Sequence, residues 1–145
     1  MPQNDAAAMK WHRLADQGDA VAQRNLGLMF AIGQGVPQND AEAMKWFRLA
    51  ANQGNASAQF ILGVRFDNGE GVPQNDAEAM KWYRLAADQG DAGAQNNLGM
   101  RFAIGRGVLR NDAEAMKWFR LAADQGHADA QFGLGEMFGT GRGVL

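Results

Sequence analysis

The stretch Gly69-Glu-Gly-Val-Pro-Gln-Asn-Asp76 decides the fold because it recurs along the chain at a fixed interval. Similar octapeptides start at Gly33 and Gly105, 36 residues to either side, and a shortened copy starts at Gly141. A nucleotide-binding loop is normally built once per domain, whereas a period of roughly 20 to 50 residues is typical of repeat architectures. We interpret the glycines as helix caps. An anion site formed by backbone amides is the alternative, but the Lys-Ser/Thr of a Walker loop is missing.

Each repeat unit predicts two helices, called helix A and helix B below. In the second unit, residues 40–54 predict helix A, with Asp40 as N-cap and Gly54 in a left-handed conformation at the C-terminal end. Its apolar residues follow the spacing of one buried face. Asn55 is expected to cap helix B. Helix B has an interior glycine in every unit, such as Gly63, which predicts close packing against a large side chain of helix A.

Four such pairs predict an all-α fold of eight helices. A single pair cannot bury its apolar faces, so stacked pairs form an α-solenoid with a continuous core. We expect one repeat domain over residues 1–145, with units at 2–36, 37–72, 73–108 and 109–145. The tryptophans at equivalent helix-A positions are expected in the core: Trp11, Trp46, Trp82 and Trp118. The first helix A is one residue shorter and has His12 at an aromatic position, so the first pair is expected to pack least well.

The recurring residues resemble the Sel1-like repeat, a relative of the tetratricopeptide repeat with bacterial members. The pattern Ala43-x-x-Trp-Phe-x-x-Ala-Ala-x-x-Gly54, then Ala58-Gln59-x-x-Leu62-Gly63-x-x-Phe66 and the glycine loop, recurs along essentially the whole chain. The resemblance implies a right-handed superhelix with helix A on its concave side, and an adaptor or scaffold role in protein binding. A cysteine-rich branch is linked to penicillin binding or β-lactamase activity. That hydrolase is a distant alternative, from which this cysteine-free chain departs.

Composition argues against several classes of function. The net charge is -2 and no cluster of Lys or Arg favours nucleic acid. With no cysteine and two histidines, neither a disulfide framework nor a thiolate metal site is expected. No apolar run approaches the roughly 20 residues that span a bilayer, and the first residues do not resemble a signal peptide. We expect a soluble chain with no cofactor and no membrane insertion, in a compartment that the sequence leaves open.

No catalytic residue is predicted. The two histidines, His12 and His127, lie at unlike repeat positions, and Ser57 and Thr140 are the only serine and threonine of the chain. Neither hydroxyl belongs to a nucleophile motif, and catalysis would need a base and a nucleophile that converge in one pocket. We therefore expect that the protein is not an enzyme.

The candidate binding residues lie on the concave face of helix A. In three units Met, Arg and Asp or Asn are spaced at i, i+4 and i+8 beside a lysine, which favours adaptable apolar contact and carboxylate recognition. We predict that they bind a peptide or a partner protein: Met44, Lys45, Arg48, Asn52, Met80, Lys81, Arg84, Asp88, Met116, Lys117, Arg120 and Asp124.

Two further predictions concern other surfaces. Variable helix-B positions offer an apolar contact patch formed by Phe60, Ile61 and Phe132. Neither end shows the polar outer face that normally caps a solenoid. The alternative hypothesis is therefore a self-associating, designed or excised repeat segment whose ends stack or swap.

Overall fold

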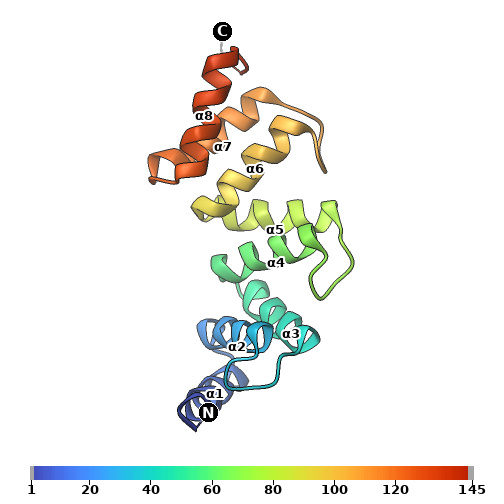
Figure 1. Ribbon diagram of the computed structural model, residues 1–145, viewed down its shortest axis with the longest axis vertical. Coiled ribbons are helices and arrows are strands. Elements are labelled where there is room, and N and C mark those ends of the chain that lie inside the picture. The colour runs from blue at the N-terminus through green and yellow to red at the C-terminus, as the bar shows by residue number, and fades with distance from the viewer. Residues whose placement is uncertain (1, 144–145) are drawn as a thin grey trace. The chain divides into compact units, whose positions relative to one another are not determined.

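The computed structural model describes residues 2–143, with side chains from residue 6 onward, and this range contains eight α-helices and no strand. Helices A and B alternate along the chain (Figure 1). The prediction of an all-α repeat solenoid is confirmed. Val144 and Leu145, the last residues of the shortened loop copy, lie outside the described residues. The helices are α1 (Pro2–Asp16), α2 (Ala20–Ile32), α3 (Asp40–Asn52), α4 (Ala56–Asn68), α5 (Asp76–Asp88), α6 (Ala92–Ile104), α7 (Asp112–Asp124) and α8 (Ala128–Thr140).

The helices fall into two compact units. Unit 1, Met1–Asn75, contains α1 to α4, and unit 2, Asp76–Leu145, contains α5 to α8. In unit 1, α2 packs against α1 and α3, and α3 also packs against α4. In unit 2, α6 packs against α5 and α7, α7 also packs against α8, and α6 touches α8. Thus α3 and α7 each lie between two helices B. The expected single domain with four repeat units stays a prediction.

Asparagine caps helix A, one residue before the predicted aspartate. The Asn39 side-chain oxygen accepts a hydrogen bond from the Glu42 N–H at 3.1 Å, and the fourth unit repeats this arrangement. Asp40 is the first helical residue, where its negative charge favours the positive end of the helix dipole. The Asn-Asp pair offers two good N-caps in succession, so the sequence pattern did not separate them.

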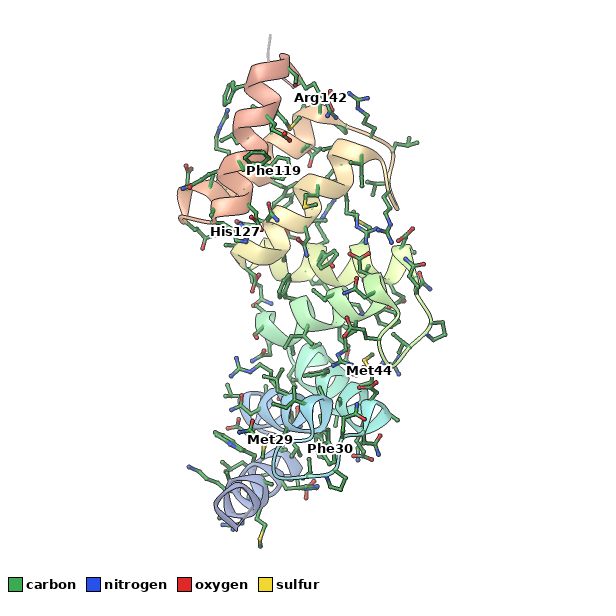
Figure 2. All side chains as sticks on the ribbon, viewed as in Figure 1. Met29, Phe30, Met44, Phe119, His127 and Arg142 are labelled. Atoms are coloured by element: carbon green, nitrogen blue, oxygen red, sulfur yellow. The ribbon has the colours of Figure 1, made fainter. Side chains whose placement is uncertain are left out.

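The remaining caps agree with the sequence. The Asn55 side-chain oxygen accepts a hydrogen bond from the Ala58 N–H at 2.8 Å. At the start of α8, His127 (labelled in Figure 2) accepts through Nδ1 from the Ala130 N–H at 3.3 Å. Gly69 ends α4 at φ +70°, and its N–H and that of Glu70 both donate to the Arg65 carbonyl. These loop amides are engaged in ending the helix, which supports capping over anion binding.

Two interior glycines of helix B, in α2 and α6, pack against aromatic rings. A Cβ added to Gly27 of α2 would lie 2.6 Å from the Phe47 ring of α3. At Gly99 of α6 the corresponding distance to Phe119 of α7 is 2.7 Å, shorter than real Cβ contacts. The predicted close packing is confirmed at both positions, and the ring comes from the helix A that follows the glycine in the chain. At Gly135 of α8 an added Cβ would meet no described atom within 4 Å, so the predicted close packing is not found there.

The tryptophans of α3, α5 and α7 are buried, as predicted. In α1, Trp11 and His12 are only half-buried, and the His12 ring meets Trp46 edge-on with centroids 5.6 Å apart. Phe47, the residue of α3 equivalent to His12, is fully buried. The first helix A is therefore less deeply buried than α3. That the first pair packs least well of the four stays a prediction.

Candidate functional site

The methionines of the predicted binding row are not on the surface. Met44, Met80 and Met116 are 3%, 8% and 4% exposed (Figure 2 labels the first). Each lies beneath the glycine loop that closes its own repeat: a Cβ on Gly71 would be 3.2 Å from Met44 Cγ, and one on Gly107 would be 3.1 Å from Met80 Cγ. The expectation of exposed methionines is thus corrected, because the loop folds back over helix A and makes them core residues.

Nine other residues of the prediction are exposed, and we call them the helix-A face. They lie on α3 in unit 1 and on α5 and α7 in unit 2, and each unit is considered by itself. Their partner-binding role stays a prediction. The nine are Lys45, Arg48, Asn52, Lys81, Arg84, Asp88, Lys117, Arg120 and Asp124.

Within the described residues, aromatic rings lie beside five of the six cations of this face, all except Arg120. Each lysine Nζ lies 4.7 to 4.8 Å from the centroid of the tryptophan that follows it in the sequence. The Arg48 guanidinium lies 5.9 Å from the Phe66 ring of α4. Arg84 lies 5.9 Å from two rings, those of Phe102 on α6 and Trp118 on α7. Such cation–π contacts orient a charged group without consuming its hydrogen-bond donors.

The helix-A face can therefore recognise carboxylates. An oriented guanidinium offers a planar fork of N–H donors that matches a carboxylate bidentately. Within the part of the chain that the structure describes, Arg48, Arg84 and Arg120 make no ion pair with an acidic side chain. Asp88 and Asp124, at the ends of their helices, give the face mixed charge.

Sequence reasoning missed a second charged feature, an arginine clamp on the first residue of helix A. In unit 1, Arg65 Nη1 of α4 lies 3.4 Å from the Asp40 carboxylate of α3. In unit 2, Asp76 of α5 is held by Arg101 Nη1 at 2.9 Å and Arg106 Nε at 3.2 Å. The Arg and Asp are about 25 or 30 residues apart within one period, a relation that only pairwise comparison of the repeats would reveal.

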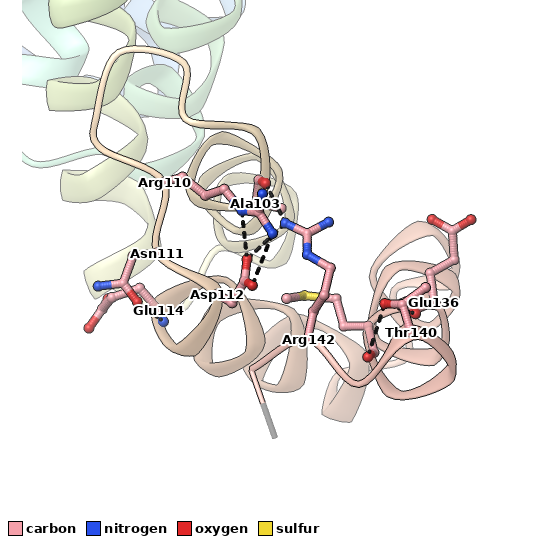
Figure 3. A network of polar contacts seen from close by, with 9 residues as sticks. Ala103, Arg110, Asn111, Asp112, Glu114, Glu136, Thr140 and Arg142 are labelled. Carbon is pink, nitrogen blue, oxygen red and sulfur yellow. Dashed lines mark hydrogen bonds and ion pairs between the residues drawn. The ribbon is translucent and has the colours of Figure 1, made fainter. Parts of the chain in front are cut away.

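The clamp on α7 is formed by two arginines from different loops. Arg142 Nη2 donates to Asp112 Oδ1 at 2.8 Å and to the Ala103 carbonyl at 2.6 Å, while Arg110 approaches the same carboxylate from the preceding loop (Figure 3). The hydrogen bonds from Arg142 and then Arg110 lower the pKa of Asp112 from 3.8 to about 2. The same bond raises the pKa of Arg142 above its usual value. The clamp ties the loop after α8 to the start of α7.

The predicted apolar patch is divided between the two units. Phe60 and Ile61 are half-buried on α4 of unit 1, whereas Phe132 on α8 of unit 2 is 70% exposed. Phe132 borders a cavity of about 680 Å³ between α6 and α8, which Phe119 also lines. Unit 2 by itself thus contains an apolar depression, and a joint patch of the three residues stays a prediction.

The two histidines have local partners within the described residues. His12 pairs with Asp16 at 3.4 Å on the surface of α1, and His127 caps α8. No group of three or more His, Cys, Asp or Glu side chains in the described range could hold a metal ion. None of the described helices is long and apolar enough to cross a bilayer.

Comparison with known proteins agrees with this architecture. The family model named Sel1 repeat matches residues 1–18, 20–55, 56–91, 92–127 and 128–145. The structure of a protective antigen present in uropathogenic Escherichia coli strains is 43% identical, with a TM-score of 0.92, over 94% of this chain and 29% of that chain. A Sel1 repeat protein from Oxalobacter formigenes is 35% identical, with a TM-score of 0.91, over 97% of this chain and 58% of that chain.

A more distant likeness shows the fold alone. Helicobacter pylori cysteine rich protein B is 23% identical, with a TM-score of 0.66, over 85% of this chain and 93% of that chain. No curated protein matches the chain. The present chain spans less than two thirds of the E. coli and O. formigenes proteins.

Eight helices in the described range, stacked as pairs, form an all-α repeat solenoid. The chain belongs to the Sel1 repeat family. The family model places the repeat boundary at the start of helix B, whereas the glycine loop suggested a boundary before helix A. Sel1 repeat proteins are generally non-catalytic helical scaffolds.

Proposed function

We propose that this chain is a protein-interaction module whose helix-A face captures a carboxylate-bearing segment of a peptide or partner protein. The observation that carries the proposal is the setting of Arg84, which is exposed on α5 with its guanidinium 5.9 Å from the ring centroids of both Phe102 and Trp118. The two rings fix the guanidinium before a ligand arrives. Less side-chain entropy is then lost on binding than for a mobile surface arginine.

The charged neighbours favour an extended segment with several polar groups. In unit 2, Lys81 and Lys117 flank the two arginine positions, and each is held over a tryptophan ring. Asp88 and Asp124 lie one turn beyond the arginines and supply acceptors at the far edge of the face. A peptide with an acidic residue followed by a donor-rich or basic residue matches this order of charges.

A displayed peptide library, selected against the wild-type chain, tests the proposal. We expect enrichment of carboxylate-containing peptides and a loss of about tenfold or more in their affinity for Arg84→Glu, because the introduced charge repels the ligand. Arg84→Lys keeps the charge but loses the planar fork, so an intermediate loss is expected. Arg24→Glu on α2 is the control, because Arg24 bonds only its neighbour Asn25 among the described residues. Peptides that bind Arg84→Glu as well as wild type would remove the helix-A face from the proposal.

A further inference from the structure

Helices α3, α5 and α7 each expose one leucine among the charged residues of the helix-A face. Leu49, Leu85 and Leu121 are 41%, 40% and 41% exposed. The value is the same on α3 and α5, which further helical pairs follow in the chain, as on α7. The exposure therefore belongs to the repeat position. The predicted binding row did not include these leucines, although they add an apolar component to the face.

The leucine lies on the same side of its helix as the charged residues. In α7, Leu121 follows Lys117 by four residues and precedes Asp124 by three, which are the spacings that bring side chains together on a helix surface. Phe119, almost half a turn away around the helix, is 4% exposed and belongs to the core. Charged and apolar groups thus share one exposed surface on α7.

In unit 2 the arginine of α5 lies beside the apolar side of α7. The Arg84 guanidinium is 5.9 Å from the centroid of the Trp118 ring. Leu121 follows Trp118 by three residues, which corresponds to about 4.5 Å along the axis of α7. A carboxylate bound by Arg84 therefore lies about one helical turn from the exposed leucine. We call Arg84, Trp118 and Leu121 the α5–α7 junction.

We propose that the α5–α7 junction binds an acidic residue and a bulky apolar residue that stand two positions apart in an extended segment of the partner. Arg84 pairs with the carboxylate, and Leu121 contacts the apolar side chain. Residues i and i+2 of an extended chain point to the same side and lie about 7 Å apart, whereas adjacent residues point to opposite sides. The leucine adds a second contact to the carboxylate contact of Arg84, so this site rests on the proposed function and narrows its ligand.

The charge of the junction favours this ligand over a purely apolar one. An apolar segment alone would take Arg84 out of water without giving it an acceptor, and burying an unpaired charge is costly. A segment with a carboxylate pairs the guanidinium, while the neighbouring apolar side chain removes leucine surface from water. The junction therefore selects for both features together.

Unit 1 provides a natural control, because its helices A lack this combination. Arg13 of α1 is the residue equivalent to Arg84, but in the described part of the chain it lies over no aromatic ring. The His12 ring meets Trp46 instead. Leu49 has the same exposure as Leu121 and lies in an identical stretch of sequence, residues 40–51 against 112–123. A substitution at Leu49 therefore has a similar structural cost but does not alter the junction.

A series of end-blocked peptides tests the spacing on the wild-type chain. Each peptide carries one glutamate and one leucine in a Gly/Ser background, with the leucine one, two or three positions from the glutamate. An NMR titration of the full chain measures their affinities, including weak ones. We expect the tightest binding at two positions, about fivefold tighter than with serine in place of leucine. Replacing glutamate by glutamine should lower affinity about tenfold, because the charged partner of the guanidinium is lost.

Substitutions in the protein locate the apolar contact. Leu121→Gln should remove the advantage of leucine over serine in the peptide and leave the affinity for the serine peptide unchanged. Leu121→Met should keep most of that advantage because the side chain stays apolar. Leu49→Gln is the matched control and should keep it in full. Glutamine and methionine are both good helix formers, so circular dichroism should show the same helix content in all three variants.

The outcomes separate this site from the proposed function. Binding that requires glutamate and is lost with Arg84→Glu, but shows no preference for leucine two positions away, overturns the apolar contact and leaves the proposed function standing. Binding that does not depend on glutamate overturns both. A leucine preference that Leu49→Gln removes as strongly as Leu121→Gln overturns the assignment to the junction. Light scattering of the chain alone should show a monomer, and self-association abolished by Leu121→Gln would assign the surface to a second copy instead.

Discussion

The pairs α3–α4 and α7–α8 start from the same sequence, but arginines at different repeat positions contact the first aspartate of each pair. Residues 40–51 and 112–123 are identical, yet Asp40 is held by Arg65 from helix α4, and Asp112 by Arg142 from the loop after α8. The repeat position of Arg65 is occupied by Met137 in the last pair. The aspartate is the constant half of the clamp, and the arginine can come from either of two positions five residues apart.

The pair α5–α6 shows that both positions can be used together. Arg101 corresponds to Arg65 and Arg106 to Arg142, and both lie within hydrogen-bonding distance of Asp76. The arginine from the loop is partly exposed, whereas the helical arginine of α6 is nearly buried: Arg142 is 33% exposed and Arg101 4%. The helical position should therefore stabilise the pair more.

The largest effect is expected in the core shared by both pairs. Phe47→Ala should lower the free energy of unfolding by about 3–5 kcal/mol, because a fully buried ring against Gly27 is lost. Phe119→Ala should cost less, because that ring borders the cavity beside α8 and the site can admit water. Urea denaturation followed by circular dichroism measures both. Equal losses of unfolding free energy would mean that the cavity does not reduce the cost of removing the Phe119 ring.

Arg65→Met should have a moderate effect. Methionine occupies the equivalent position in α2 and α8, so the apolar stem remains while the contact with Asp40 is lost. Because that carboxylate is 45% exposed, we expect a loss of about 1 kcal/mol in unfolding free energy. Arg120→Met on the exposed face of α7 is the control and should change little. A neutral Arg65→Met would show that the helical clamp does not stabilise unit 1.

Acid should weaken the contact between Asp112 and Arg142. Folding lowers the pKa of Asp112 to about 2 from a usual 3.8, so its stabilisation is fully present above pH 4 and is lost as the pH falls towards 2. The difference in melting temperature between wild type and Asp112→Asn should therefore shrink over this interval and disappear below it. Thermal denaturation at pH 5, 4, 3 and 2 measures the difference. A difference that is constant down to pH 2 would contradict the role of the carboxylate.

The smallest effect is expected from adding the missing helical arginine. Met137→Arg places in α8 the side chain that α6 has at residue 101, so Asp112 would be held from both positions. Alone it should leave stability nearly unchanged, since Arg142 already contacts the carboxylate. In the background of Arg142→Ala it should restore the melting temperature, which differential scanning calorimetry can follow. Failure to restore it would show that the two positions are not interchangeable.

Much of the fold was predictable because its signals are local and repeated. The period, the helix cap at Asn55 and the left-handed Gly69 follow from residue types at fixed spacing. The N-cap of helix A was misplaced by one residue, because Asn39 and Asp40 are both good caps. The candidate site was less predictable. Helical spacing groups Met44 with Arg48, but it does not show which of them a loop covers.

The sequence by itself determined the repeat, the helix pairs and the close approach at Gly27 and Gly99, since each depends on contacts within one period. Only the tertiary structure decided which residues remain on the surface. The glycine loops bury Met44, Met80 and Met116, and arginines from two different positions reach the same aspartate. These outcomes depend on how neighbouring helices pack, and near-identical repeats can differ there because the packing partners differ.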